Sequence, residues 1–314
     1  SLTNLAGSTV VMGTGTDTLT MSAVAGAAFS IGATAVSGGA AKVSGVTTLN
    51  LAALTGDSTV LTITPGAALA ITAPTDGILS IAGTGSTITV AQDAGEPLTL
   101  SGTSNYAVSG GTTSAITSTG TGTLQVTSSD NAQTVTSSAV TTVVGAALGD
   151  TLTIAGTGAF TVTGVGTITG VTVTEAGTAT GALTVSTVDT TASAITQVTG
   201  ATGAFVLNAV GTGGTAAVTL TALASHASQT INMTTTSAVT VAAGSTSTAY
   251  TVVASDANAH IYVNSSTTSS VDTYTGGTAI DTVTLGLGGD SFTSGGGADV
   301  INIAATTDTA IATG

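Results

Sequence analysis

Residues 276–302 read GGTAIDTVT LGLGGDSFT SGGGADVIN, which is three consecutive units of nine residues. Every unit has Asp at its sixth position and an apolar residue at its eighth. The spacing of nine continues one unit further in each direction. The aspartates in this register are Asp272, Asp281, Asp290, Asp299 and Asp308, and the apolar residues that follow them are Tyr274, Val283, Phe292, Ile301 and Ala310. Five aspartates at one fixed spacing identify a nonapeptide repeat.

The nonapeptide predicts a parallel β-helix in which each unit supplies one turn and one short strand. Six residues form a turn, where glycine permits a positive φ, and three form a short strand whose apolar side chain points inward. Two units make one coil, so every second aspartate of the register should stack on the same edge. We therefore expect Asp272, Asp290 and Asp308 on one edge and Asp281 and Asp299 on the other.

Calcium is the ligand that this pattern predicts. Ca²⁺ takes six to eight oxygen ligands, which aspartates and turn carbonyls supply, and the ion would couple folding to metal binding. The alternative is that the aspartates only suit turns, where their side chains bond the backbone. The segment Met12–Thr20 reads MGTGTDTLT and offers Asp17 as a further calcium ligand, whereas Asp57 and Asp150 are interpreted as turn residues.

Short alternating runs of Thr and Val dominate the rest of the chain and predict strands, because alternation with period two places β-branched residues on a pleated sheet. The predicted strands include Thr59–Thr64, Thr87–Val90, Thr134–Thr136, Thr161–Thr163, Val171–Thr174 and Val239–Val241. The weakest helix candidates are the Ala-rich stretches Ser22–Ala28 and Leu220–Ser228. We predict an all-β chain, a β-solenoid or parallel β-roll with little or no helix. Residues 1–265 would form a solenoid or sandwich-like region, and residues 266–314 the calcium-binding repeats.

Composition excludes several classes of function. The 314 residues include one Lys+Arg, 15 Asp+Glu and no Cys, for a formal net charge of −14. Nucleic-acid binding needs a basic surface, and this chain offers only Lys42. The sequence has no apolar run of the length, about 18 residues, that predicts a transmembrane helix. Only 3% of residues are aromatic, so we expect a thin core of small side chains.

Catalytic constellations are not evident, and we expect no enzyme. Asp256 and His260 could be imagined as part of a Ser-His-Asp arrangement, but no nucleophile elbow accompanies them. His226 and His260 are interpreted as surface or half-buried residues, and Glu96 and Glu175 as isolated carboxylates. Asn232 and Asn264 match the glycosylation triplet, which arises freely in a chain rich in Ser and Thr.

The C-terminal units resemble RTX nonapeptide repeats of proteins exported by type I secretion. The remainder is similar in composition to RTX-type bacterial surface-layer proteins, including the Caulobacter surface-layer family, and Val43–Leu54 (VSGVTTLNLAAL) is similar to a segment of such proteins, with Thr47 where Glu is usual. The glycine pattern of the RTX nonapeptide is incomplete in this chain, because each of the three units in residues 276–302 lacks one of its glycines. The resemblance implies calcium sites at Asp272, Asp281, Asp290, Asp299, Asp308 and Asp17.

The expected function is that of an extracellular structural subunit of a bacterial surface layer that assembles with copies of itself through calcium. Cell-surface polysaccharide is a further expected partner. Two alternatives remain open at this stage. One is a segment of an RTX adhesin, and the other is a secreted filament subunit assembled by strand donation, which the uncharged Thr-rich edges favour.

Overall fold

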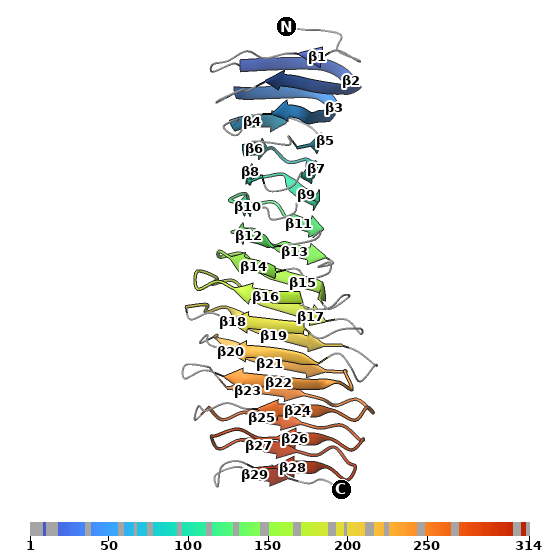
Figure 1. Ribbon diagram of the computed structural model, residues 1–314, viewed down its shortest axis with the longest axis vertical. Helices are drawn as coiled ribbons and strands as arrows, with labels where there is room; N and C mark the ends of the chain where they lie inside the picture. The colour runs from blue at the N-terminus through green and yellow to red at the C-terminus, as the bar shows by residue number, and fades with distance from the viewer. Residues whose placement is uncertain are drawn as a thin grey trace. The chain divides into compact units, whose positions relative to one another are not determined.

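The computed structural model describes residues 9–10, 18–34, 39–55, 60–65, 68–73, 78–92, 96–110, 115–127, 132–144, 151–165, 171–187, 193–197, 200–210, 217–222, 226–243, 249–264, 270–303 and 309–311. The chain divides into two compact units, Ser1–Val143 (unit 1) and Val144–Gly314 (unit 2). Every regular element in the described residues is a β-strand (Figure 1).

Unit 1 contains the first thirteen strands, which are β1 (Thr9–Val10), β2 (Thr18–Thr34), β3 (Gly39–Thr55), β4 (Val60–Pro65), β5 (Leu69–Thr72), β6 (Ile78–Gly83), β7 (Thr87–Gln92), β8 (Leu98–Gly102), β9 (Asn105–Gly110), β10 (Ala115–Ser118), β11 (Leu124–Thr127), β12 (Gln133–Ser137) and β13 (Thr141–Val144). Unit 2 contains β14 (Thr151–Ala155), β15 (Phe160–Val165), β16 (Val171–Glu175), β17 (Leu183–Thr187), β18 (Ser193–Gln197), β19 (Ala204–Ala209), β20 (Val218–Ala222), β21 (Ser228–Met233), β22 (Ala238–Ala243), β23 (Tyr250–Val253), β24 (Ile261–Asn264), β25 (Thr273–Thr275), β26 (Thr282–Thr284), β27 (Ser291–Thr293), β28 (Val300–Asn302) and β29 (Thr309–Ile311).

Strand pairing identifies both units as β-solenoids. From β5 onward within each unit, a strand pairs in parallel with the strand two places later, as β7 does with β9 and β17 with β19. Two strands therefore make one coil, and odd- and even-numbered strands form two stacks. In unit 1 the long strand β3 joins the stacks, because it pairs with both β4 and β5. In Figure 1 the strands of each unit lie one above another in this way. The predicted all-β solenoid is confirmed.

The observed strands lie where the Thr/Val alternation predicts them. In β7 the burial alternates residue by residue, with Ile88 and Val90 buried and Thr87 and Thr89 exposed. Each strand thus turns alternate apolar side chains into the coil and the Thr hydroxyls between them outward. The Ala-rich stretch Ser22–Ala28 is not helical but lies within β2, because pairing with β3 outweighs the weak helix preference of alanine.

Coil length differs along the chain. In the aspartate repeats Thr273 pairs with Ser291 and Thr282 with Val300, so each coil consists of two nonapeptides. In unit 1, Tyr106 pairs with Leu124 at the same spacing. Between these regions the coils are longer, because Ala204 pairs with Ser228 rather than with a residue two nonapeptides further on. A coil of two nonapeptide lengths is therefore not confined to the aspartate repeats.

The core is thin, as expected, but its aromatic side chains are concentrated in unit 2. Most buried side chains are Val, Leu and Ile, whereas the five largest fully buried side chains are Tyr250, Tyr262, Tyr274, Phe205 and Phe292. The rings of Tyr274 and Phe292 stack with centroids 5.4 Å apart, one coil after the other. The C-terminal coils thus carry a continuous aromatic column inside the solenoid. None of the described segments forms a helix long and apolar enough to cross a membrane.

Candidate functional site

Two stacks of aspartates line the turns of the C-terminal coils. We call the turns that lead into β25 and β27 the first aspartate edge, and those that lead into β26 and β28 the second aspartate edge. On the first edge, the amide of Asp272 donates to Oδ1 of Asp290 (2.8 Å), and the amide of Tyr250 donates to Oδ1 of Asp272 (2.8 Å). Each carboxylate therefore binds the backbone of the preceding coil.

The second oxygen of each carboxylate on this edge has a different partner. The amide of Gly286 donates to Oδ2 of Asp290 (2.9 Å), which closes the turn that precedes β27. Nδ2 of Asn264 donates to Oδ2 of Asp272 (2.6 Å). Both aspartates are buried, with 0% of Asp290 and 4% of Asp272 exposed. The carboxylates therefore act as structural acceptors, as the turn interpretation of these residues expects.

The second aspartate edge repeats this geometry. The amide of Asp281 donates to Oδ1 of Asp299 (2.9 Å), and the amide of His260 donates to Oδ1 of Asp281 (3.0 Å). The hydroxyl of Ser294 donates to Oδ2 of Asp299 (2.6 Å). The stacking of every second aspartate of the register is confirmed for these two pairs, while Asp308 and Asp17 lie outside the described residues.

Asp281 has one carboxylate oxygen that is poorly satisfied. Its Oδ2 is buried and accepts no hydrogen bond of good geometry, although the amide of Gly277 and the hydroxyl of Tyr274 lie near this carboxylate. A buried oxygen in this state retains capacity for a further partner.

Burial opposes the ionised form of these carboxyl groups. Burial, together with the neighbouring Asp290, raises the pKa of Asp272 to about 7, even though hydrogen bonds from the amide of Tyr250 and from Asn264 favour the charged form. The pKa of Asp281 is also raised, chiefly by burial. Anions stacked in low dielectric repel one another, so a cation between them would stabilise the charged state.

The donor chemistry of the second aspartate edge fits calcium. Carbonyl oxygens of Gly276 and Gly277 approach Gly295 of the next coil, where a Cβ would lie 2.6 and 2.5 Å from them. These two carbonyl oxygens and Oδ2 of Asp281 are the kind of ligand that Ca²⁺ prefers. No three His, Asp or Glu side chains of the described segments gather around one point, so carbonyls would have to supply most of the ligands. When bound, the ion would neutralise the stacked carboxylates.

Three buried tyrosines lie near the two aspartate edges. Only Tyr274 occupies the apolar position of the nonapeptide repeat, so the other two could not be linked to the edges from the sequence. The hydroxyls of Tyr250, Tyr262 and Tyr274 are buried without a hydrogen bond of good geometry. The hydroxyl of Tyr274 lies beside Asp281. Burial raises the pKa of Tyr274 above its ordinary value, and the charge of Asp281 adds to this rise. The interior of the C-terminal coils therefore holds polar groups whose hydrogen bonds are incomplete.

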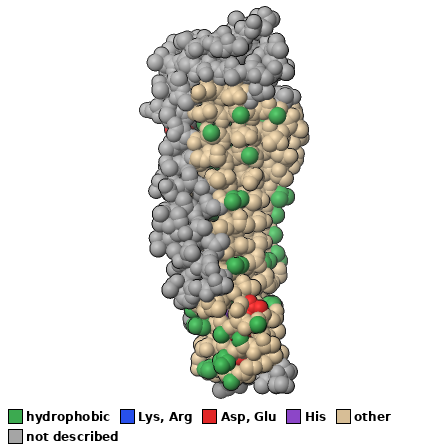
Figure 2. All heavy atoms as spheres, turned by 90° about the vertical axis from the view of Figure 1, so that its right-hand side faces the viewer, with side chains coloured by type: hydrophobic (Ala, Val, Ile, Leu, Met, Phe, Trp, Pro, Cys, Tyr) green, Lys and Arg blue, Asp and Glu red, His purple; other side chains and the backbone are tan. Residues whose placement is uncertain are grey.

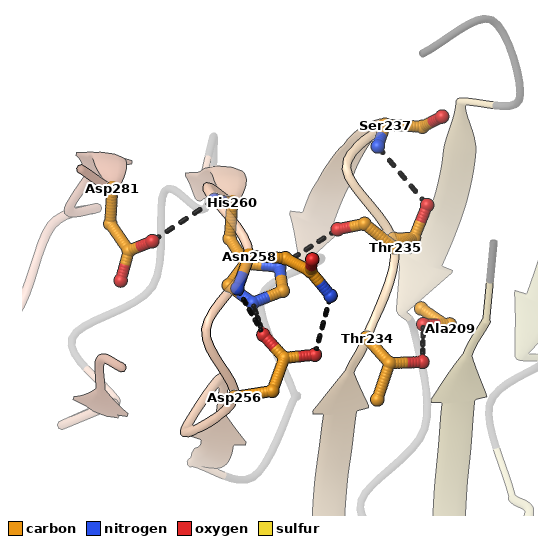
Figure 3. A network of polar contacts seen from close by, with 8 residues as sticks. All are labelled: Ala209, Thr234, Thr235, Ser237, Asp256, Asn258, His260 and Asp281. Carbon is orange, nitrogen blue, oxygen red and sulfur yellow. Dashed lines mark hydrogen bonds and ion pairs between the residues drawn. The ribbon is translucent and has the colours of Figure 1, made fainter. Parts of the chain in front are cut away.

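His260 joins the second aspartate edge to a carboxylate in the same turn (Figure 3). Its Nε2 lies 2.7 Å from Oδ1 of Asp256, and its Nδ1 lies 2.7 Å from the carbonyl of Thr235. Burial acts to raise the pKa of Asp256, but hydrogen bonds from Asn258 and His260 outweigh it and lower the pKa. Both ring nitrogens are engaged, so this pairing leaves neither of them for a serine nucleophile.

His226 forms a second histidine–carboxylate pair, with Glu175. Nε2 of His226 lies 3.0 Å from Oε2 of Glu175, and neither side chain is more than 1% exposed. The interpretation of His226 and His260 as surface or half-buried residues is therefore wrong, since 2% and 1% of them are exposed. Glu175 is not isolated either. The pairing of His226 with Glu175 could not be predicted from the sequence spacing, because these partners meet only when coils of unequal length stack. His260 and Asp256 are only four residues apart, so their contact is local to one turn.

The outward faces of unit 2 carry aligned hydroxyl and amide side chains. Thr161 is in register with Thr184, and Thr230 with Thr251 and then Thr273. In the view of Figure 2 the described surface is largely uncharged, and hydrophobic and acidic side chains gather near its lower end, where Figure 1 places the C-terminal coils. These faces can contact water or another uncharged surface without burying charge.

The described geometry thus consists of two aspartate edges, two histidine–carboxylate pairs, of which only the pair of His226 and Glu175 is buried on both sides, and polar outward faces. Comparison with known proteins adds no relative, because no family model, curated protein or solved structure matches the chain.

Proposed function

We propose that the chain is a structural subunit of an extracellular bacterial surface layer, which associates with copies of itself in the presence of calcium. The observation that carries this proposal is the pair of aspartate edges in coils of two nonapeptides, where Asp272, Asp281 and Asp290 are buried and the pKa of Asp272 rises to about 7. A divalent cation beside such a stack would stabilise the ionised form of its carboxylates.

The outward faces support an assembling role. Their Thr columns continue from coil to coil, and the whole chain contains a single Lys or Arg. Lysines on strands normally oppose association through sheet edges. A solenoid without such lysines can pack against identical neighbours, so the partner we propose is a second copy of this chain. We propose that this association takes place outside the cell, where calcium is abundant.

Calcium binding is tested by titrating the chelated full chain with Ca²⁺ and following heat release and thermal unfolding. Asp281→Asn changes the carboxylate whose Oδ2 accepts no hydrogen bond of good geometry, and it should weaken calcium binding at least tenfold. The matched control is Glu96→Gln, an acid-to-amide change in unit 1, which should bind calcium as the natural chain does. Equal affinities in all three proteins, or no saturable binding, would rule out this site.

Assembly is tested separately by electron microscopy of the same samples in millimolar calcium and in chelator. Ordered sheets that dissolve on chelation support the surface-layer role. Single rods that stay soluble in calcium would instead favour an adhesin segment, and fibres that ignore the chelator would favour strand donation.

A further inference from the structure

Exposed apolar side chains are concentrated in the C-terminal coils. Among the described residues ten large hydrophobic side chains are exposed, and six of these ten lie between residues 261 and 303. The six are Ile261, Val271, Ile280, Leu287, Val300 and Ile303. The same short part of unit 2 carries both aspartate edges, so apolar surface and buried carboxylates occur together there.

Three of these apolar side chains lie on one outward face. Ile261 of β24 is in register with Thr282 of β26, and Thr282 with Val300 of β28, so these residues occupy one position in successive coils. Ile280 precedes Thr282 by two residues, across the buried Asp281. Alternation across Asp281, which is 0% exposed whereas Ile280 is 56% exposed, places Ile280 on the same face.

Two alanines extend this face on either side of Ile280. Ala259 and Ala298 are exposed, and each stands two residues before the first residue of its strand, as Ile280 does. We call Ala259, Ile261, Ile280, Ala298 and Val300 the apolar strip. The apolar strip crosses three successive coils and contains no charged side chain.

The apolar strip lies on the outer side of the second aspartate edge. Asp281 and Asp299 stand next to strip residues in the sequence. Asp281 is buried and its amide donates to Oδ1 of Asp299, so these carboxylates line the coil behind the strip. Like charges behind two strips would oppose the approach of a second copy, and calcium at this edge would neutralise them.

The chemistry of the apolar strip favours a second copy of this chain as its partner. A basic protein would find no carboxylate on the strip itself. A second copy presents the same apolar side chains at the same spacing between paired strands, about 4.7–4.9 Å, so every coil of one strip can meet a coil of the other. A twofold axis through the strip makes this contact with one surface on both copies.

We propose that the apolar strip is the surface through which two copies of the chain associate, related by a twofold axis near Thr282, when calcium occupies the second aspartate edge. This inference rests on the proposed surface-layer role and names a contact surface for it. The strip crosses only three coils, so a single contact should be weak. In a layer many such contacts act together, and their combined strength is much greater.

Ile280→Thr tests the apolar strip, because it removes the most exposed large side chain of the strip and keeps a β-branched residue. We expect the dissociation constant of the dimer, measured by sedimentation of the full chain in millimolar calcium, to rise by about tenfold or more, since a twofold contact loses apolar area on both copies. The matched control is Ile78→Thr, because Ile78 is the first residue of β6, is 41% exposed and lies outside the strip. It should associate as the natural chain does, whereas Thr282→Ile, which enlarges the strip, should tighten association.

Calcium binding, measured by heat release, separates the apolar strip from the edge behind it. Ile280→Thr removes no oxygen ligand, so it should bind calcium as the natural chain does. Association that Ile280→Thr leaves unchanged would overturn the strip while the calcium-dependent assembly stands. A natural chain that stays monomeric in calcium at every concentration would overturn the assembly role, and the strip with it.

A cross-link identifies the partner directly. The chain contains no Cys, so Thr282→Cys carries its only thiol. With calcium and a mild oxidant such as diamide, the twofold contact brings two of these thiols together. Covalent dimers should then form about tenfold faster or more than with Ile78→Cys, because the contact raises the effective concentration of the thiols. Equal rates in the two variants, or a rate for Thr282→Cys that chelation leaves unchanged, would overturn the proposal.

Discussion

At the scale of single residues, the buried aspartates make stability depend on pH in an unusual direction. The folded pKa of Asp272 is about 7, above the value of about 3.9 expected in an unfolded chain. The folded protein therefore binds this proton more tightly, so its contribution to stability is fully present below about pH 4 and is lost as pH rises toward 7. Asp281 acts in the same direction.

We therefore predict that the chelated chain loses stability between about pH 4.5 and about pH 7, with a slope of up to about 1.4 kcal/mol per pH unit for one proton. Asp272→Asn should flatten this slope, because an amide does not titrate, and millimolar calcium should flatten it in the natural chain by stabilising the ionised form. Urea unfolding at both pH values measures the change. A chelated natural chain that gains stability over this range would contradict the prediction.

Glycine at one turn of the second aspartate edge meets two separate demands. Gly297 has φ of +85°, and a Cβ there would collide with the carbonyl oxygen of Ala279 in the preceding coil. Gly85 has a similar φ of +74°, but no atom lies within 4 Å of its Cβ position. We predict that Gly85→Ala costs about 1–2 kcal/mol, the strain of a left-handed residue. Gly297→Ala should cost about 1–3 kcal/mol more, because the backbone must also move. Chemical unfolding of both variants tests this, and equal losses would show that coil spacing does not constrain the turn.

At the scale of strands and turns, the sequence predicted what repeats at a constant spacing. The strands around Thr87 and Thr161 follow from alternation, and the stacking of Asp272 under Asp290 follows from two units of nine. The contact between His226 and Glu175 could not be predicted, because the coils between them are unequal and the register cannot be counted where coil length varies. The incomplete hydrogen bonding of the tyrosine hydroxyls likewise depends on where rings end inside the core.

The aromatic column predicts where the C-terminal strands derive their stability. Phe292 of β27 is 0% exposed and stacks on Tyr274 of β25, whereas Ile280, in the turn before β26, is 56% exposed. Phe292→Ala should cost about 3–5 kcal/mol by leaving a cavity that the narrow coil cannot close. Ile280→Ala should change stability by no more than about 0.5 kcal/mol. Hydrogen exchange of the amides of β25 to β29 would locate the loss, and a small effect of Phe292→Ala would mean that backbone pairing alone maintains these coils.

At the scale of the whole molecule, a solenoid whose coils contact only their neighbours should tolerate the removal of one complete coil. Deleting Thr273–Asp290 removes two nonapeptides and joins Asp272 to Ser291, so β27 can take the register that β25 has with β23. We expect this chain to fold and to unfold cooperatively.

The control is a deletion of equal length, Ala204–Thr221, in a region of longer coils where Ala204 pairs with Ser228 and Ser193 with Val218. That deletion leaves part of a coil behind, shifts every later side chain out of register and should abolish cooperative unfolding. Circular dichroism and urea unfolding distinguish the two chains. Equal tolerance of both deletions would show that the spacing of two nonapeptides does not set the register of the fold.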